Sequence, residues 1–234
     1  IAAKKTIKMV TDEIISVVGQ KCEYDYEIIA VNDCSPDNVL HELISIAGGN
    51  DKIKVVDFMQ NCGKEAAVLA GLGYASGDIA IITDDDYQCP INELWRLIEP
   101  IESGEYDVST AKYKVKKESF FKRFCSDINM KCAQIMLNQP KGLRFENLTA
   151  ISRPVYSKML EYKNPYPMMD GLILRITKRI ATVPMEERSR GDDNSSGFTF
   201  LKSLRLFADG YTAFSVVPLR FASIVGFVTS TMGG

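Results

Sequence analysis

The chain has 234 residues, of which 46% are hydrophobic, and its formal net charge is −2. This length suits one large α/β domain or two small ones, and the near-neutral charge gives no support to nucleic-acid binding through bulk electrostatics. The single histidine, His41, excludes histidine-based catalytic triads and three-histidine metal sites. Six scattered cysteines without a C-x-x-C pair argue against a thiolate zinc site and a disulfide framework, and they suit a reducing cytosol.

The first hundred residues alternate between helical and strand patterns. The predicted elements, in chain order, are a helix at 7–17, a strand at 26–31, a helix from Pro36 to about Ala47, a strand at 53–58, an Ala-rich helix at 63–76, a strand at 79–83 and a helix at 91–101. This order indicates a largely parallel sheet with right-handed crossovers. Because a helix opens the order, we expect a strand before it that lies outside this sequence.

The alternation loosens after residue 106. The predicted segments here are a basic stretch at 112–117, a helix at 120–137, a long mobile loop at 187–197 and a helix at 198–208. Residues 211–232 come close to a membrane span in hydropathy, but they contain Pro218 and Arg220. We therefore interpret this last segment as an interfacial helix, with a buried C-terminal helix as the alternative.

The strand at 79–83 ends in three consecutive carboxylates, Asp84, Asp85 and Asp86. Its continuous apolar run predicts a strand covered on both faces. Ligands of open α/β sheets bind beyond the carboxyl ends of such strands, and clustered carboxylates repel one another unless a cation or a proton neutralises them. These residues indicate a divalent metal site facing a phosphate-bearing substrate. A solvated acidic turn fits the three residues alone equally well.

Six segments, read in chain order, resemble glycosyltransferase family 2, the inverting enzymes of the GT-A fold. They are Val-Asn-Asp-Cys-Ser-Pro-Asp at 31–37, Asn-Cys-Gly-Lys-Glu-Ala-Ala at 61–67, Asp-Asp-Asp-Tyr-Gln at 84–88, Tyr-Pro-Met-Met-Asp-Gly-Leu at 166–172, Arg-Ser-Arg at 188–190 and Phe-Ser-Val-Val-Pro-Leu-Arg at 214–220. The resemblance is to the branch that moves sugars from nucleotide donors onto polyprenyl phosphates. It implies an α/β, GT-A-like nucleotide-sugar-binding sandwich with a mostly parallel central sheet flanked by helices. It further implies a catalytic domain at 1–210 and an amphipathic juxtamembrane segment at 211–234 that leads to spanning helices outside this sequence.

The resemblance also implies a donor site. Asp86 would be a direct ligand of Mg²⁺ or Mn²⁺, and Asp84 would contact the ribose or the water shell of the metal. Such an ion stabilises a departing diphosphate, and it usually takes only one or two carboxylates from the protein. Asp33 would meet the nucleobase or the ribose. The other implied nucleotide-binding residues are Asn61, Gly63, Lys64 and Asp85. The start of a helix at Gly63 and Lys64 could hold an anion, although a turn glycine and a surface lysine explain this pair equally well.

Basic residues are implied for the phosphates. Arg188 and Arg190 lie in a segment that resembles a lid over the donor diphosphate, and arginine pairs well with phosphate oxygens. The basic residues that would suit an acceptor phosphate at an anionic membrane surface are Lys112, Lys116, Lys117, Lys122 and Arg123. A solvated basic face accounts for this last group equally well.

The general base stays unassigned. A lipid phosphate is already anionic near neutral pH, so its attack needs little help from a base. The family often has an aspartate just before the segment that matches 148–153, where this chain has Asn147, preceded by Glu146. Asp170 is the other carboxylate in a matching motif, with a catalytic or a structural role.

The expected function is that of an inverting, metal-dependent glycosyltransferase that moves a sugar from a UDP- or GDP-sugar to a polyprenyl phosphate. It would act at the cytoplasmic face of the cell membrane, anchored there in the full-length protein, with a homo-oligomer as one expected assembly. Alternatives are a glycan or protein acceptor, or a sugar-nucleotide-binding protein without turnover. A haloacid-dehalogenase-like phosphatase is disfavoured, because Tyr87 and Gln88 stand where its motif needs a threonine.

Overall fold

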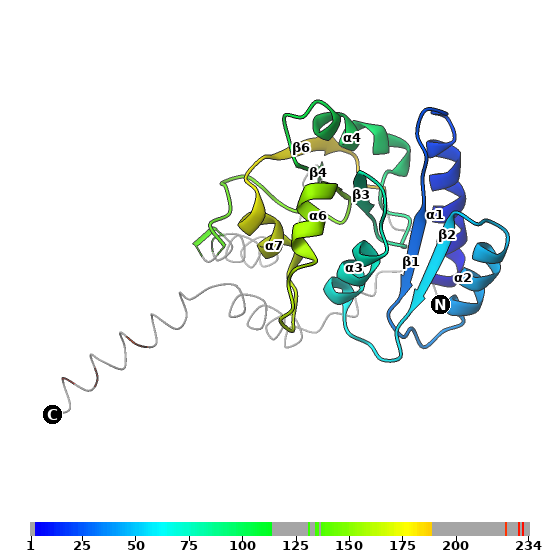
Figure 1. The fold of residues 1–234 in the computed structure, drawn as a ribbon, viewed down its shortest axis with the longest axis horizontal. Helices are drawn as coiled ribbons and strands as arrows, with labels where there is room; N and C mark the ends of the chain where they lie inside the picture. The colour runs from blue at the N-terminus through cyan, green and yellow to red at the C-terminus, as the bar shows by residue number, and fades with distance from the viewer. Residues whose placement is uncertain are drawn as a thin grey trace.

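The structure, a computed structural model, describes residues 3–113, 131, 134–135 and 137–188, together with the single positions 223, 229 and 231. Its elements, in chain order, are α1 (Ala3–Val18), β1 (Ile28–Asn32), α2 (Val39–Gly48), β2 (Ile53–Asp57), α3 (Lys64–Gly73), β3 (Ile79–Ile82), η1 (Ile91–Glu93), α4 (Leu94–Glu102), β4 (Val108–Tyr113), β5 (Thr149–Ser152), α6 (Arg153–Met159), α7 (Met169–Ile176) and β6 (Ile180–Met185). Figure 1 shows their arrangement.

The strands form two sheets. The first holds β1 and β2, which pair in parallel from Ile28↔Ile53 to Asn32↔Asp57. The second has the order β3-β5-β4-β6, in which β5 runs antiparallel to both β3 and β4, and β4 runs parallel to β6. Three strands of this sheet therefore point the same way, and the predicted α/β class is confirmed, with β5 as the reversed strand.

Helices cover the first sheet and connect it to the second. α2 packs against β1 and β2, α3 packs against β1, and α1 contacts both α2 and η1 (Figure 1). The contact between α3 and β1 depends on Gly71, because a β-carbon at this position would lie 3.1 Å from Cγ2 of Val31. A glycine within a helix costs helix stability, and here, in the last turn of α3, it allows the strand to approach closely.

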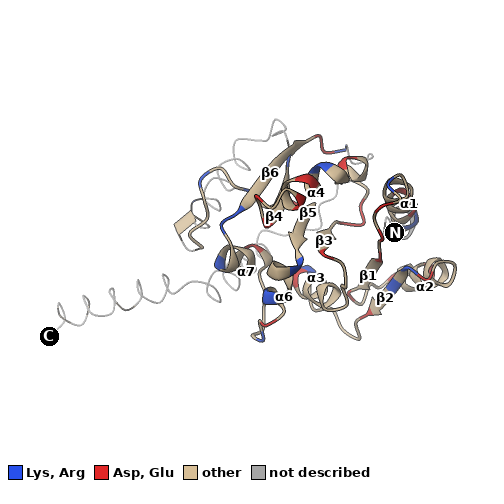
Figure 2. Cartoon of the chain, turned by 45° about the horizontal axis from the view of Figure 1, so that its top comes forward, with Lys and Arg blue, Asp and Glu red and all other residues tan. Residues whose placement is uncertain are grey.

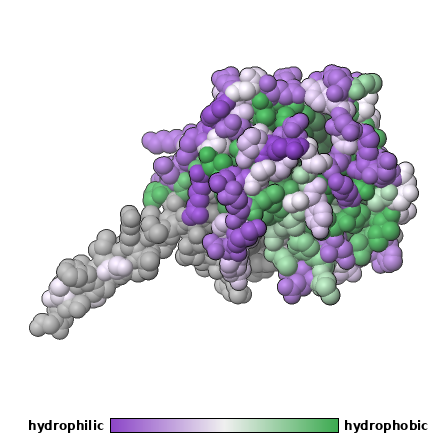
Figure 3. All heavy atoms as spheres, in the orientation of Figure 1, coloured by the Kyte–Doolittle hydropathy of each residue, from purple (hydrophilic) through white to green (hydrophobic). Residues whose placement is uncertain are grey.

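Two apolar clusters cover opposite faces of the second sheet. Neighbouring residues of a strand point to opposite faces, and Ala150 belongs to one cluster while Ile151 belongs to the other. The first cluster includes the fully buried Leu97 of α4, and the second includes Met159 of α6 and Ile173 of α7. The sheet is thus enclosed between α4 on one side and α6 with α7 on the other. On the face of the molecule that Figure 3 shows, hydrophilic and hydrophobic residues are interspersed.

The strand β3 is covered on both faces, as predicted, because Ile79 and Ile81 pack against the first cluster and Ala80 and Ile82 pack against the second. All four of its residues are nevertheless only partly buried. The reason is its position at the edge of the second sheet, where it has β5 as its neighbour in that sheet.

Several predicted segments lie outside the described residues. They are most of the helix at 120–137, the loop beyond Arg188, the helix at 198–208 and, apart from three single positions, the juxtamembrane segment at 211–234. The division of the chain into 1–210 and 211–234 therefore stays a prediction. Within the described part of the chain, no helix has the length and apolar character needed to cross a membrane.

Candidate functional site

The loops after β1 and β2 are tied together by Asp33. Because the two strands are parallel, both loops leave the same edge of the sheet. The Asp33 carboxylate accepts hydrogen bonds from the N–H groups of Cys62 (2.7 Å) and Gly63 (2.8 Å), and the Asn61 side chain donates to the Asp33 carbonyl oxygen (2.9 Å). Three residues predicted for nucleotide binding, Asp33, Asn61 and Gly63, are therefore brought together.

The same contacts involve the start of α3, where an anion was predicted to bind. The N–H of Gly63, which precedes the helix, is taken by the Asp33 carboxylate. Gly63 adopts φ +89°, a conformation that strains residues with a β-carbon, so glycine allows the sharp entry into the helix. The Asp33 carboxylate thus takes one N–H group at the start of α3, and an anion bound there stays a prediction.

The acidic loop after β3 faces the start of α3. Nζ of Lys64 lies 2.5 Å from Oδ1 of Asp84, and Oδ1 of Asp86 accepts the N–H of Gln88 (3.1 Å). Burial raises the pKa of Asp85, and the charges of Asp84 and Asp86 raise it further. Negative charge thus accumulates on this loop, and the cationic end of Lys64 partly balances it. Figure 2 shows acidic segments close to β1 and β3.

The acidic loop fits a divalent cation. Asp84 and Asp86 supply hard oxygen donors. The pKa of Asp85 is raised mainly by burial and further by the charges of Asp84 and Asp86, which a cation would offset. The described residues contain no group of three or more His, Cys, Asp or Glu side chains that could hold a metal ion by themselves. Mg²⁺ and Mn²⁺ commonly complete their coordination with water and substrate phosphates, so two carboxylates are a sufficient protein contribution.

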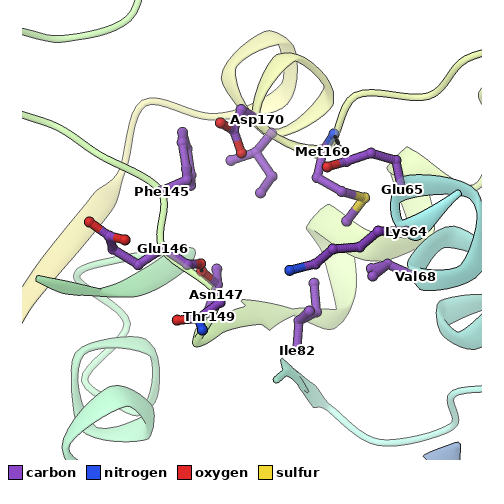
Figure 4. A pocket seen from close by; sticks show the side chains of 11 residues that line it. Lys64, Glu65, Val68, Ile82, Phe145, Glu146, Asn147, Thr149, Met169 and Asp170 are labelled. Atoms are coloured by element: carbon purple, nitrogen blue, oxygen red, sulfur yellow. Dashed lines mark hydrogen bonds between the residues drawn. The ribbon is translucent and has the colours of Figure 1, made fainter. Parts of the chain in front are cut away.

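A pocket of about 220 Å³ opens beside Lys64, between α3, β3, β5 and α7. Its lining combines apolar walls with ionisable groups and consists of Lys64, Glu65, Val68, Ile82, Phe145, Glu146, Asn147, Thr149, Met169, Asp170 and Ile173. Figure 4 shows Lys64 and Asp170 reaching the pocket from different helices, α3 and α7. Lys64 thus contacts both the acidic loop, through Asp84, and the pocket that Asp170 also lines.

The carboxyl group of Asp170 is a weaker acid than an ordinary aspartate. Burial, together with the charges of Glu65 and Glu146, raises its pKa to about 7, and Lys64 counteracts this only in part. Burial also raises the pKa of Glu146. A carboxyl group that titrates near neutral pH can accept a proton from a bound hydroxyl, so Asp170 has the acidity of a general base.

Arg188 contacts the acidic loop from the segment after β6. Its backbone N–H donates to the carbonyl oxygen of Gln88 (3.1 Å), and its guanidinium lies 4.7 Å from the ring centroid of Tyr87. The guanidinium makes a two-pronged pair with Glu13 of α1 (2.7 and 2.5 Å) and donates to Asn92 (2.6 Å). Arg188 is therefore next to the proposed metal loop, while its charge is already paired. Its role in diphosphate binding stays a prediction.

Of the remaining predicted phosphate ligands, the structure describes Lys112. Lys112 is exposed near the end of β4. Arg190, Arg123, Lys116, Lys117 and Lys122 lie outside the described part of the chain. Glu65, which lines the pocket and contacts α7, was not among the predicted site residues. Its position beside Lys64 in a matching motif was the available signal.

The family model for "Glycosyl transferase family 2" matches residues 2–160. The chain belongs to this family. It is similar to the uncharacterized glycosyltransferase YkcC of Bacillus subtilis (strain 168), with 28% identity over 95% of this chain and 69% of that protein. It is also similar to undecaprenyl-phosphate 4-deoxy-4-formamido-L-arabinose transferase of Proteus mirabilis (strain HI4320), with 31% identity over 92% of this chain and 65% of that protein.

Solved structures share the fold. Glucosyl-3-phosphoglycerate synthase from Mycobacterium tuberculosis, in complex with Mn²⁺, UDP-glucose and phosphoglyceric acid, matches with a TM-score of 0.63 and 19% identity over 91% of this chain and 76% of that chain. The mannosyltransferase PcManGT from Pyrobaculum calidifontis, in complex with GDP-mannose and Mn²⁺, matches with a TM-score of 0.52 and 18% identity over 77% and 51% of the two chains. The GT-A-like fold predicted from the family resemblance is thus confirmed.

Proposed function

We propose that this family 2 glycosyltransferase moves a sugar, with inversion, from a nucleotide diphosphate sugar to a polyprenyl phosphate at the cytoplasmic face of the membrane. The observation that carries the proposal is the pocket between Lys64 and Asp170, which adjoins the acidic loop at the edge where the Asp33 and Asn61 loops meet. The similarity to an undecaprenyl-phosphate sugar transferase over 92% of the chain supports the choice of acceptor.

The donor would be held at the acidic loop. Asp84 and Asp86 would bind the divalent cation, which when bound neutralises charge on the departing diphosphate as a Lewis acid. The Asp33 loop would contact the nucleoside. Similar folds hold UDP-glucose or GDP-mannose together with Mn²⁺, which supports a nucleotide-sugar donor and a metal ion of this type.

The pocket would hold the transferred sugar and the acceptor oxygen. In the transfer step this oxygen attacks the anomeric carbon, and the bond between that carbon and the diphosphate oxygen breaks. The ammonium of Lys64 adds positive charge beside the leaving group, where negative charge develops. A phosphate acceptor brings no proton that must be removed, so the replacement of the usual aspartate by Asn147 is compatible with this reaction.

A hydroxyl acceptor on a glycan or a protein is the second candidate. It is favoured by one observation, the Asp170 pKa of about 7 in the same pocket. A hydroxyl group must lose its proton as it attacks, and a carboxylate of this basicity could receive it. The two candidates therefore differ in whether Asp170 accepts a proton.

The test compares two acceptors that differ only in the phosphate. The full-length protein in membrane vesicles receives Mn²⁺ and a radiolabelled UDP- or GDP-sugar, with either undecaprenyl phosphate or undecaprenol. We expect organic-extractable label with the phosphate and none with the alcohol. Label that appears only on a glycan or protein fraction would contradict the lipid acceptor and support the second candidate.

A further inference from the structure

Glu65 joins two helices that are far apart in the sequence. It lies in the first turn of α3, and its Oε2 accepts the N–H of Met169, the first residue of α7, at 2.7 Å. The residue before α7, Met168, provides no side-chain hydrogen bond to the helix start. Helix starts carry N–H groups without partners inside the helix, and a carboxylate is a favourable acceptor for them. Glu65 therefore supplies, from another helix, the cap that α7 lacks.

We propose that Glu65 is a positioning residue of the transferase site, which caps α7 from α3 and thereby fixes Asp170 in the pocket beside Lys64. The proposal rests on the proposed function, because that function gives the pocket its role in sugar transfer. The geometry alone carries the positioning, because Met169 and Asp170 are consecutive residues of the first turn of α7 and both line the pocket with Glu65 (Figure 4). A shift of this turn would move Asp170 with it.

The charge of Glu65 also acts on Asp170. The charged groups around Asp170 are Lys64 and Glu65 from α3 and Glu146 from the segment before β5, and the basic residue of α7 itself is Arg175 in the last turn. Burial is the largest cause of the raised pKa of Asp170, and the Glu65 charge is the second. Glu65 accepts a backbone N–H at a helix start, which favours its own ionised form, although burial raises its pKa. The pKa of Asp170, at about 7, lies near neutral pH, so the titration of Asp170 reports the charge of Glu65.

Two substitutions separate the cap from the charge. Glu65→Gln keeps a carbonyl oxygen that can accept the Met169 N–H, but it removes the negative charge. Glu65→Leu removes both. Glu99→Gln on α4, where the glutamate is exposed, is the matched control. The first readout is the titration of the Asp170 carboxyl carbon by ¹³C NMR, assigned by its loss in Asp170→Asn. The second is kcat and KM for transfer from the nucleotide sugar.

For Glu65→Gln we expect the pKa of Asp170 to fall by about one unit, a roughly tenfold loss of proton affinity, with an unchanged melting temperature. For Glu65→Leu we expect the same fall and about a tenfold lower kcat, with KM for the donor unchanged, because the reacting groups lose alignment. Glu99→Gln should match the unsubstituted protein. An Asp170 titration that is the same in Glu65→Gln as in the unsubstituted protein, with native kcat in Glu65→Leu, would overturn the proposal.

The proposed function can fail separately. If Asp170→Asn transfers sugar at the native rate while Glu65→Gln still lowers the Asp170 pKa, a catalytic role for Asp170 is contradicted and its positioning by Glu65 stands. If none of the variants, nor the unsubstituted protein, transfers sugar to any acceptor tested, the NMR titration still decides the positioning.

Discussion

The two sides of the site, the donor edge and the pocket wall, differ in how they manage charge. The donor edge consists of the loops after β1, β2 and β3, where Asp33 accepts two backbone N–H groups and Asp84 pairs with Lys64. The pocket wall consists of Glu65, Glu146 and Asp170, whose carboxyl groups all have raised pKa values because they are buried. Asp33 and Asp84 at the donor edge thus have N–H or cationic partners, whereas burial favours the protonated forms of the carboxyl groups in the pocket wall.

This difference teaches which chemistry each side can support. Ionised carboxylates beside open space are suited to a metal ion and a charged nucleotide. A carboxyl group with a pKa of about 7, as Asp170 has, is suited to proton transfer or to contact with neutral sugar hydroxyls. Four experiments, in order of decreasing expected effect, test this division between nucleotide binding at the donor edge and proton transfer at the pocket wall.

The largest effect is expected for Asp86→Ala at the donor edge. Loss of a metal ligand should weaken Mn²⁺-dependent binding of UDP or GDP about 100-fold, or ~2.7 kcal/mol. Calorimetry with and without Mn²⁺ measures this, and Asp51→Ala at an exposed turn is the control. Equal nucleotide affinity in Asp86→Ala and Asp51→Ala would show that the donor edge does not hold the metal.

Asp33→Asn should have the next largest effect. The amide can accept only one of the two N–H groups that the carboxylate accepts now, so the loops after β1 and β2 lose part of their connection. We expect a loss of about 1–3 kcal/mol in the free energy of unfolding, together with weaker nucleotide binding. Urea denaturation and calorimetry measure the two effects. A variant with native stability and unchanged nucleotide affinity would show that Asp33 neither holds the two loops together nor contributes to nucleotide binding.

Asp170→Asn should stabilise the protein in a pH-dependent way. Because the folded pKa of Asp170 is raised to about 7, ionising this group costs folding free energy, and the cost grows as pH rises from about 4 to 7. Asparagine avoids that cost. We expect the variant to be more stable than the native protein by about 1–3 kcal/mol at pH 8, and by less at pH 5. Urea denaturation at both pH values checks this, and a pH-independent difference would contradict the raised pKa.

The smallest effect is expected at the pair of Arg188 and Glu13, whose side chains are 25% and 17% exposed. A double-mutant cycle with Arg188→Gln and Glu13→Gln should give a coupling energy of about 1 kcal/mol. If Arg188 also binds the diphosphate, Arg188→Gln weakens UDP or GDP binding several-fold and Glu13→Gln does not. Equal losses of affinity in the two variants would mean that the pair only anchors the acidic loop.

Much of the donor edge could be predicted from the sequence. The loops that form it follow successive predicted strands, and β1 with β2 places two of them at a shared edge. Hydrophobic periodicity over the first hundred residues was sufficient to predict these strands and the helices between them. Their boundaries differ from the predictions by a few residues, as for the helix predicted from Pro36, which begins as α2 at Val39.

The pocket wall could not be predicted in the same way. β4 contains the fully buried Ser109 and Thr110, and the Thr110 hydroxyl hydrogen-bonds that of Thr149 in β5 at 2.9 Å. Such polar residues do not give a strand pattern until the partner strand is known. The acidity of Asp170 likewise depends on Glu65, which belongs to a helix formed much earlier in the chain. These properties arise from long-range contacts, which no local pattern reports.

The order of strands in the second sheet has a consequence for how the chain folds. β3 and β4 are consecutive in sequence, yet β5 lies between them and pairs with both. During synthesis, β1 and β2 can pair as soon as residue 57 is available, whereas β3 and β4 wait for residues 149–152. The chain between β3 and β5 is longer than that between β1 and β2, so bringing its ends together costs more conformational entropy before the strands can pair. The donor edge therefore begins to form early in synthesis, and the pocket is completed only when the later half of the chain has been made.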